Sequence, residues 1–478
     1  MDLCNNRVYA HSRRDMLRMI SCGFGLMAFA GIASQAAAAE RLAAAARRDG
    51  GTDGNPLLPK ASHFPAKAKR VIFLCMAGGP SHVDTFDYKP ELVANDGKSL
   101  SGVRAGAKLL ASPWKFKQYG KSGLWVSDLF PEIGKHADDM CLLHGMHTAV
   151  PAHAQATVLM HTGSFQFVRP SVGAWSLYGL GTENQNLPGF ITLNPPSGNG
   201  GAQNYGSGFL PAVYQGTRVG IERSARRQGG GSEAMPNLRN PMLSTKAQRE
   251  QLDLLQALNH ERARREAGDD AVEGVIGSYE LAFRMQAEMP ELMDISKESK
   301  KTLDAYGIGT GNDGFARQCL LARRFAEKGV RYIEVNQGGW DTHRNLRDDL
   351  EKQAGLIDRP IAALLADLKA RGMLKDTLVV WGGEFGRTPY AQNGDGRDHN
   401  HKGFTMWMAG GGVKGGMNYG ATDPNGIEAV DGQMDIHDLH ATILHLMGMD
   451  HEKLTYRYAG RDFRLTEVYG QVANGILA

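Results

Sequence analysis

The chain has 478 residues, with 54 Lys or Arg and 51 Asp or Glu, so its formal net charge is +3 when the 16 histidines are counted as neutral. This balance argues against a polybasic nucleic-acid-binding protein and against an acidic disordered chain, and a hydrophobic content of 42% suffices for a packed core. No segment reaches the roughly 18–20 consecutive apolar residues of a transmembrane helix. We therefore expect neither a nucleic-acid partner nor a stable membrane span.

Residues 1–39 have the features of an export signal. Arg13 and Arg14 precede a Gly- and Ala-rich apolar stretch, residues 19–33, and the small residues at 36–39 suit cleavage by a signal peptidase. This order predicts a twin-arginine signal peptide, a periplasmic or secreted location, and the twin-arginine translocase as a partner during export. A short membrane anchor is the alternative.

Apolar runs alternate with amphipathic stretches beyond residues 40–70, which are rich in Ala, Arg, Lys and Pro and are expected to form a linker or an arm. We expect strands at 71–76, 330–335, 377–381 and 404–409, and helices at 315–328, 346–371 and 434–447. This alternation predicts an α/β domain with a mostly parallel sheet over residues 71–470, followed by a tail, residues 471–478. Residues 195–300 are first rich in Gly, Pro, Asn and Ser and then highly charged, which predicts a long inserted lid.

Carboxylates and imidazoles stand beside glycines at the ends of the predicted strands. Because functional residues of parallel sheets gather just past the carboxyl ends of the strands, we expect these side chains to converge. Asp, Glu and neutral His ligate divalent cations. The candidate ligands of a Zn, Ca, Mg or Mn ion are His82, Asp84, Asp341, His343, Glu384, His399 and His401.

Structural interpretations of the same residues stay open. Asp341 could cap the helix predicted near Leu346, and Glu384 could form an ion pair with Arg387. The segment from Asp398 to His401 could be a polar turn. On the predicted helix 434–447, His440 could be either a site residue or a structural residue.

His153 begins a predicted helix, residues 152–161, within a segment that holds four histidines. The amino terminus of a helix carries partial positive charge and free N–H groups, which suit an anionic oxygen. His153 could be a covalent nucleophile, a metal ligand or a general base, or it could be a core or capping residue. We favour the ligand or the base.

Several motifs of this chain resemble domain-of-unknown-function family 1501, in the sulfatase-like branch of the alkaline phosphatase superfamily. The resemblance runs from about Val71 to Gly470. The motifs that carry it are residues 76–87, Thr162-Gly163-Ser164, residues 169–175, 338–343, 383–389, 397–403 and 437–448. It implies a three-layer α/β sandwich that holds one or two divalent metals, where an alcohol- or thiol-derived nucleophile attacks a phosphate or sulfate ester.

The resemblance also implies roles for single residues. Asp341 matches a metal-binding Asp of the superfamily, and His343 falls near a second ligand of that metal. Glu384 matches the Asp of an Asp-His pair, and the late His ligand falls on His401 or its neighbour His399.

Three positions depart from the superfamily pattern. Phe385 replaces the His of the Asp-His pair, and the nucleophile position falls on His153. After the first strand, Gly78 or Gly79 stands where relatives have a metal-binding Asp, so His82 and Asp84 are the candidate substitutes. These departures argue against a standard two-zinc phosphatase, and no Cys stands in the context of a formylglycine sulfatase.

We therefore expect an exported, metal-dependent hydrolase of sulfate or phosphate esters, either small molecules or polysaccharides. Arg387 is expected to contact the anionic group through its guanidinium. The alternative is a non-catalytic binding protein on the same scaffold, for example one for sulfated polysaccharide.

Overall fold

The computed structural model describes residues 55–99, 106–220, 242–265, 270–311, 313–392 and 394–478. The predicted signal peptide and the first part of the predicted linker therefore lie outside the described residues. Within the described ranges, no helix combines the length and the apolar composition that a bilayer span requires.

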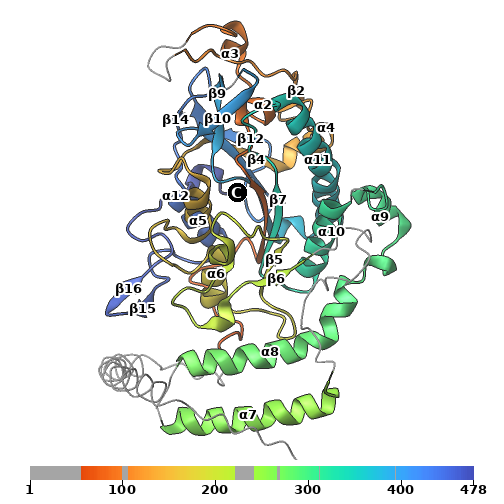
Figure 1. The fold of residues 1–478 in the computed structure, drawn as a ribbon, viewed down its shortest axis with the longest axis vertical. Helices are drawn as coiled ribbons and strands as arrows, with labels where there is room; N and C mark the ends of the chain where they lie inside the picture. Colours follow the sequence, from red (N-terminus) through yellow and green to blue (C-terminus); the bar gives the residue numbers. More distant parts are fainter. Residues whose placement is uncertain (1–54, 100–105, 221–241, 266–269, 312, 393) are drawn as a thin grey trace, which may run out of the picture.

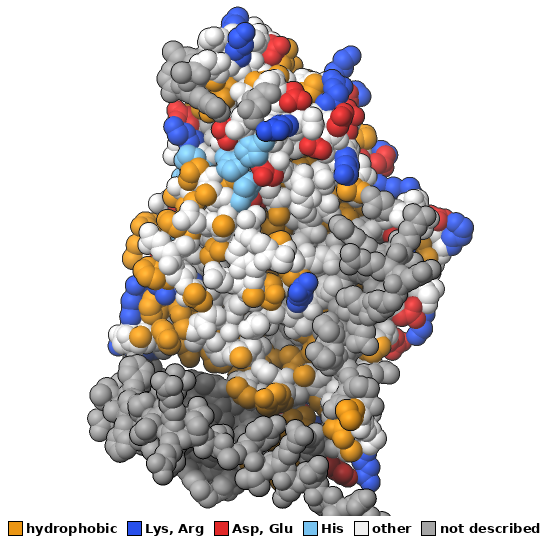
Figure 2. Space-filling view, in the orientation of Figure 1, with side chains coloured by type: hydrophobic (Ala, Val, Ile, Leu, Met, Phe, Trp, Pro, Cys, Tyr) orange, Lys and Arg blue, Asp and Glu red, His pale blue; other side chains and the backbone are white. Residues whose placement is uncertain are grey.

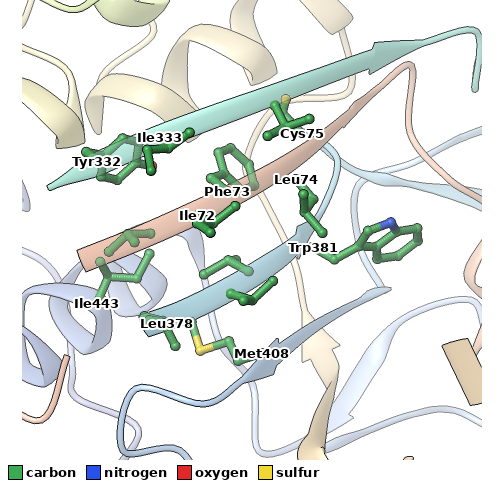
Figure 3. Close-up of a cluster of buried hydrophobic side chains, with 14 of the residues drawn as sticks. Ile72, Phe73, Leu74, Cys75, Tyr332, Ile333, Leu378, Trp381, Met408 and Ile443 are labelled. Carbon is green, nitrogen blue, oxygen red and sulfur yellow. The ribbon is translucent and has the colours of Figure 1, made fainter. Parts of the chain in front are cut away.

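The centre of the fold is β1 (Arg70–Ala77), whose sequence RVIFLCMA is apolar on both faces and buried from Val71 to Met76. Such a run fits a strand covered on both sides. Figure 3 shows its side chains packed against Tyr332 and Ile333 of β7, Leu378 and Trp381 of β8, Met408 of β11 and Ile443 of α12.

The main sheet has eight strands in the order β12-β4-β11-β8-β1-β7-β5-β6. Its strands are β4 (Met140–Met146), β5 (Phe190–Leu193), β6 (Thr217–Val219), β7 (Tyr332–Gly338), β8 (Thr377–Gly382), β11 (Phe404–Ala409), β12 (Met417–Tyr419) and β1. All neighbouring pairs are parallel except the two that β11 makes with β4 and β8. The predicted α/β class with a mostly parallel sheet is confirmed.

Helices cover both faces of the sheet and make three layers (Figure 1). One layer contains α10 (Gly314–Glu327) and α11 (Leu346–Ala370); the other contains α5 (His153–Thr162), α6 (Val172–Leu180) and α12 (Ile436–Leu446). The predicted helices at 315–328, 346–371 and 434–447 are α10, α11 and α12. Their ends differ from the prediction by one or two residues.

Smaller elements surround this frame. The remaining helices are α2 (His82–Thr85), α3 (Pro90–Ala94), α4 (Pro131–Gly134), α7 (Thr245–Arg265), α8 (Asp270–Met293) and α9 (Lys300–Tyr306). The remaining strands are β2 (Phe116–Tyr119), β3 (Leu124–Ser127), β9 (Gly386–Gln392), β10 (Gly396–Asn400), β13 (Ala421–Thr422), β14 (Ala429–Asp431), β15 (Tyr456–Tyr458) and β16 (Arg461–Phe463).

The described parts of the segment 195–300, for which a lid was predicted, include one strand of the main sheet and two long helices. It returns to the main sheet as β6, which pairs in parallel with β5. Its long helices α7 and α8 pack on each other and lie at the end of the molecule opposite to the β9–β10 hairpin (Figure 1). Buried Leu281, Met285 and Met289 fix α8 to the body, so this helix pair extends the body away from the strand ends that carry the clusters.

The described part of the predicted linker, residues 55–70, and the predicted tail, residues 471–478, both pack on the domain. Before β1, the side chain of Leu57 is buried, and the N–H groups of Lys67 and Ala68 donate to the carbonyl oxygen of Leu446. After the last strand, Ile476 is fully buried and Leu477 pairs with Val413.

Candidate metal centre

The loops that follow β1, β7 and β8 meet at one edge of the sheet. Ala77 pairs with Gly338, and Cys75 pairs with Gly382, so these three strands end level with one another. Because β11 runs in the opposite direction, the β9–β10 hairpin that precedes it reaches the same edge. The amino terminus of α5 brings His153 to the same edge.

Four side chains from these segments converge: His153, Asp341, His343 and His399. Asp341 Oδ1 lies 3.2 Å from His153 Nε2, 2.8 Å from His343 Nε2 and 3.6 Å from His399 Nε2. The Nε2 atoms of His343 and His399 are 3.0 Å apart. Figure 2 shows a patch of histidine side chains open to the surface above the middle of the molecule.

The other ring nitrogen of each histidine is committed to an oxygen. His153 Nδ1–H donates to Glu384 Oε1 at 2.6 Å, and His343 Nδ1–H donates to Gln392 Oε1 at 2.5 Å. His399 Nδ1–H donates to the Pro151 carbonyl at 2.7 Å. Because these oxygens only accept, each imidazole in its neutral form has its lone pair on Nε2. The four candidate donor atoms, three imidazole nitrogens and one carboxylate oxygen, lie within 4.8 Å of one another.

A cation fits this arrangement. Two Nε2 lone pairs that face each other at 3.0 Å repel unless a proton or a metal ion lies between them. Among the described residues, the buried Nε2 of His153 has only the 3.2 Å ion-pair contact with Asp341 Oδ1 and no hydrogen bond of good geometry. Adjacent ligands of a tetrahedral cation with bonds of about 2.0–2.1 Å are separated by about 3.3 Å, and Asp341 Oδ1 lies 2.8–3.6 Å from the three Nε2 atoms.

The electrostatics of the cluster also demand positive charge. Burial alone would lower the pKa of His153, but the carboxylates of Asp341 and Glu384 raise it to about 9. Burial alone would raise the pKa of Asp341, but His153, His399 and Arg387 hold it well below its usual range. Without a metal, a proton on His153 supplies the charge that the carboxylates require.

Glu384 lies behind His153 and outside the group of four. Its side chain is 1% exposed, and the Gly78 N–H donates to both of its oxygens, at 3.0 and 3.2 Å. Gly78 has φ +117°, and a Cβ there would lie 2.6 Å from the Asp341 nitrogen. The glycine therefore permits the close approach of these two loops.

Arg387 is fully buried, so the structure does not place it where a substrate would meet it, contrary to expectation. Its Nε donates to the Gly79 carbonyl at 3.1 Å, and one terminal nitrogen donates to the Gly78 carbonyl and to Asp341 Oδ1. Burial lowers the pKa of Arg387, although Asp341 opposes that shift. The guanidinium orients Asp341 from beneath.

Besides Glu384, three predicted ligands lie outside the group of four. Asp84 forms a buried ion pair with Arg397, at 2.6 and 3.0 Å. His82 is buried and its Nε2 bonds the Gly426 carbonyl at 2.8 Å. His401 lies past the end of β10, because the chain turns at Asn400, whose amide donates to the Gly403 carbonyl.

The structural interpretations of the retained residues can also be compared with the geometry. Asn345, and not Asp341, is the residue that precedes α11. Arg387 pairs with Asp341 and not with Glu384, and His399 stands on a strand and not in a turn. Gln392 and Pro151, which anchor His343 and His399, were not predicted from the sequence. Neither has a local signal, since both contribute only through the pairing of distant segments.

The fold and this cluster define an α/β protein with a surface group of three imidazoles and one carboxylate that could hold a metal ion. The chain belongs to the family described as "Protein of unknown function (DUF1501)", whose model matches residues 68–477. No curated protein matches the sequence.

Solved structures with some similarity include sulfatases and phosphatases. The PsFucS1 sulfatase from Pseudoalteromonas sp. is 12% identical, with 93% of this chain and 76% of that chain covered and a TM-score of 0.38. The alkaline phosphatase from the Antarctic bacterium TAB5 is 12% identical, with coverage of 80% and 98% and a TM-score of 0.32. The lipoteichoic acid synthase LtaP from Listeria monocytogenes is 10% identical, with coverage of 86% and 79% and a TM-score of 0.36. Because every TM-score is below 0.5, we draw nothing about the site from these structures.

Proposed function

We propose that this protein is an exported, metal-dependent hydrolase of phosphate or sulfate esters. The observation that carries the proposal is the convergence of three Nε2 atoms on Asp341 Oδ1, each imidazole being anchored through its Nδ1. Metal-ligating histidines characteristically donate their other N–H to an oxygen in this way. His153, Asp341, His343 and His399 would hold the ion.

The donor set narrows the choice of metal. Imidazole nitrogen suits zinc and other transition metals, whereas calcium and magnesium prefer shells made of oxygen. Three nitrogens and one oxygen therefore favour Zn²⁺ over Ca²⁺ and Mg²⁺. A bound divalent ion supplies a Lewis acid for an ester oxygen and lowers the pKa of water.

The residues around the centre suit water as the attacking group. Both nitrogens of His153 are committed, Nδ1 to Glu384 and Nε2 to the cluster, so we assign it as a ligand and not as a covalent nucleophile. The side chain of Asp341 is 46% exposed, which leaves the cluster open on one side. Arg344, the exposed residue after His343, is our candidate for recognising the anionic ester, and Figure 2 shows basic side chains beside the histidine patch.

The test is metal content together with hydrolysis. The protein loaded with Zn²⁺ or Mn²⁺ should hydrolyse aryl phosphates or aryl sulfates, and His153→Ala should lower kcat/KM by about three orders of magnitude, or about 4 kcal/mol of transition-state stabilisation. Arg344→Ala should raise KM while metal content stays unchanged. A protein that holds one metal ion but cleaves none of the esters would instead be the non-catalytic binding protein.

A further inference from the structure

Glu384 touches the cluster without belonging to it. We infer that Glu384 is a positioning residue that holds His153 with Nε2 directed at the metal, an inference that rests on the proposed metal site. The contact is the 2.6 Å hydrogen bond from His153 Nδ1–H to Glu384 Oε1. A carboxylate there can only accept, so it fixes the tautomer that leaves Nε2 free for a cation.

The geometry argues against Glu384 as a ligand. Its oxygens already accept bonds from His153 and from the Gly78 N–H, and its side chain is 1% exposed. The group of donor atoms that lie within 4.8 Å of one another contains His153 but not Glu384. The sequence expectation of a direct ligand is therefore replaced by an indirect role.

Glu384 differs from the oxygens that anchor the other two imidazoles because it is charged. His343 is held by an amide oxygen and His399 by a backbone carbonyl. A hydrogen bond to a carboxylate is about twice as strong as a neutral one, and it makes the imidazole a stronger electron donor. His153 is thus the imidazole whose ligand strength depends most on its partner.

Packing confines His153 to this one orientation. The ring of Phe385 lies 4.7 Å from the rings of both His153 and His399, and those two imidazoles lie 4.3 Å apart in an edge-on arrangement. A Cβ at Gly79 would lie 2.8 Å from the Phe385 ring, so that ring also fills the space beside the first loop. The hydrogen bond from His153 to Glu384 is therefore shielded from water. Such a bond is stronger in the protein interior than in water.

The test measures metal affinity and coordination, not turnover. We would titrate Zn²⁺ against a chromogenic chelator and record the visible spectrum of the Co²⁺ form, for Glu384→Gln, Glu384→Ala and His153→Ala. Asp358→Asn is the matched control, because Asp358 is a buried carboxylate that accepts two backbone N–H groups, those of Glu132 and Ile133.

Glu384→Ala should weaken Zn²⁺ binding by about 10–100-fold, the range known for partners of metal ligands. Glu384→Gln should weaken it less and keep the Co²⁺ spectrum of the wild type, because all four ligands remain. His153→Ala should change that spectrum, and Asp358→Asn should leave the affinity unchanged. If Glu384→Ala does not fold, Glu384→Gln decides alone, since it preserves the size of the side chain.

Three results would overturn the inference. Glu384 variants that bind Zn²⁺ as tightly as the wild type would show that the contact does no positioning. A Co²⁺ spectrum of Glu384→Gln that indicates one ligand fewer than in the wild type would make Glu384 a ligand. A wild type without Zn²⁺ affinity would refute both the proposed function and this inference. Tight, Glu384-dependent metal binding without hydrolysis of any ester would refute only the proposed function.

Discussion

The guanidinium of Arg387 carries its charge at a position with no exposed surface. A buried charge is costly unless it is paired and hydrogen-bonded, and here the carbonyls of Gly78 and Gly79 and the carboxylate of Asp341 supply the partners. The same side chain therefore closes the loop after β1 and sets the orientation of a proposed ligand.

Arg387→Lys should lower the free energy of unfolding by about 2–3 kcal/mol, because an ammonium group cannot reproduce the fork of donors. Urea denaturation of the metal-free protein measures this loss. Arg347→Lys, at a side chain that is 61% exposed, is the control and should change nothing. An unchanged midpoint in Arg387→Lys would contradict the assigned support of Asp341.

Single substitutions can distinguish the proposed metal ligands from nearby residues that are not ligands. Asp341→Asn and His399→Ala should each lose stoichiometric Zn²⁺ by elemental analysis. His401→Ala should retain it, because His401 lies outside the group of four. Loss of metal in His401→Ala would restore the expectation drawn from the sequence.

The sequence predicts the residue types of the site better than their partners. Asp341, His343 and His399 stand beside strand ends, so the strand-end rule selects them. The same rule also selects Asp84, and nothing local indicates that Arg397, more than 300 positions away, occupies that carboxylate. Long-range pairing decides which atoms remain free for a metal.

At the scale of elements, α12 packs against α5 through a buried histidine. His440 is 1% exposed, and its Nε2–H donates to the Met160 carbonyl at 2.7 Å. Burial is the main cause that lowers the pKa of His440 to about 3, and the nearby His437 adds to it. His440 thus remains neutral in the folded protein and serves the packing of two helices.

This contact predicts acid sensitivity with a definite sign. The folded pKa of about 3 lies below the unfolded value, so the unfolded state binds the proton first. The contribution of neutral His440 to the free energy of unfolding is fully present above about pH 6.5. It is lost towards pH 3, by up to about 1.4 kcal/mol per pH unit. Urea midpoints at pH 7 and pH 4.5 should differ less in His440→Gln; an equal difference would contradict this.

Elements with continuous apolar runs were predictable, and those with mixed composition were not. The run over β1 and the periodic apolar positions of α11 predict their elements within two residues. In β10 the sequence GRDHN indicates a polar turn, yet it pairs with β9 as an antiparallel strand. His399 is the residue of this strand that joins the cluster, and no apolar alternation marks the segment as a strand.

At the scale of the whole molecule, the β9–β10 hairpin, which carries His399, and the α7–α8 pair lie towards opposite ends (Figure 1). On α7, Leu252 is buried, while Leu254, Leu255 and Leu258 are exposed. The helical part of the predicted lid therefore lies away from the strand ends, and composition alone could not show this, since a charged helical insertion can fold towards either end.

Hydrogen exchange can test this separation. Addition of Zn²⁺ should slow amide exchange by at least tenfold at Gly78, at the first turn of α5 and at residues 341–345, because ligand binding suppresses local opening. Amides of α7 should exchange at the same rate with and without metal. Protection of α7 by the metal would indicate closure over the site.

His153 and His399 are separated by about half of the chain, yet their rings lie 4.3 Å apart. A cation bound between them would act as a reversible cross-link, whose binding energy is gained only once the sheet is assembled. An extended chain threaded through a membrane pore would lose such an ion and would have to find it again in the outer compartment. A folded chain could carry it across, so the predicted twin-arginine route would let the cell choose the metal before the protein leaves.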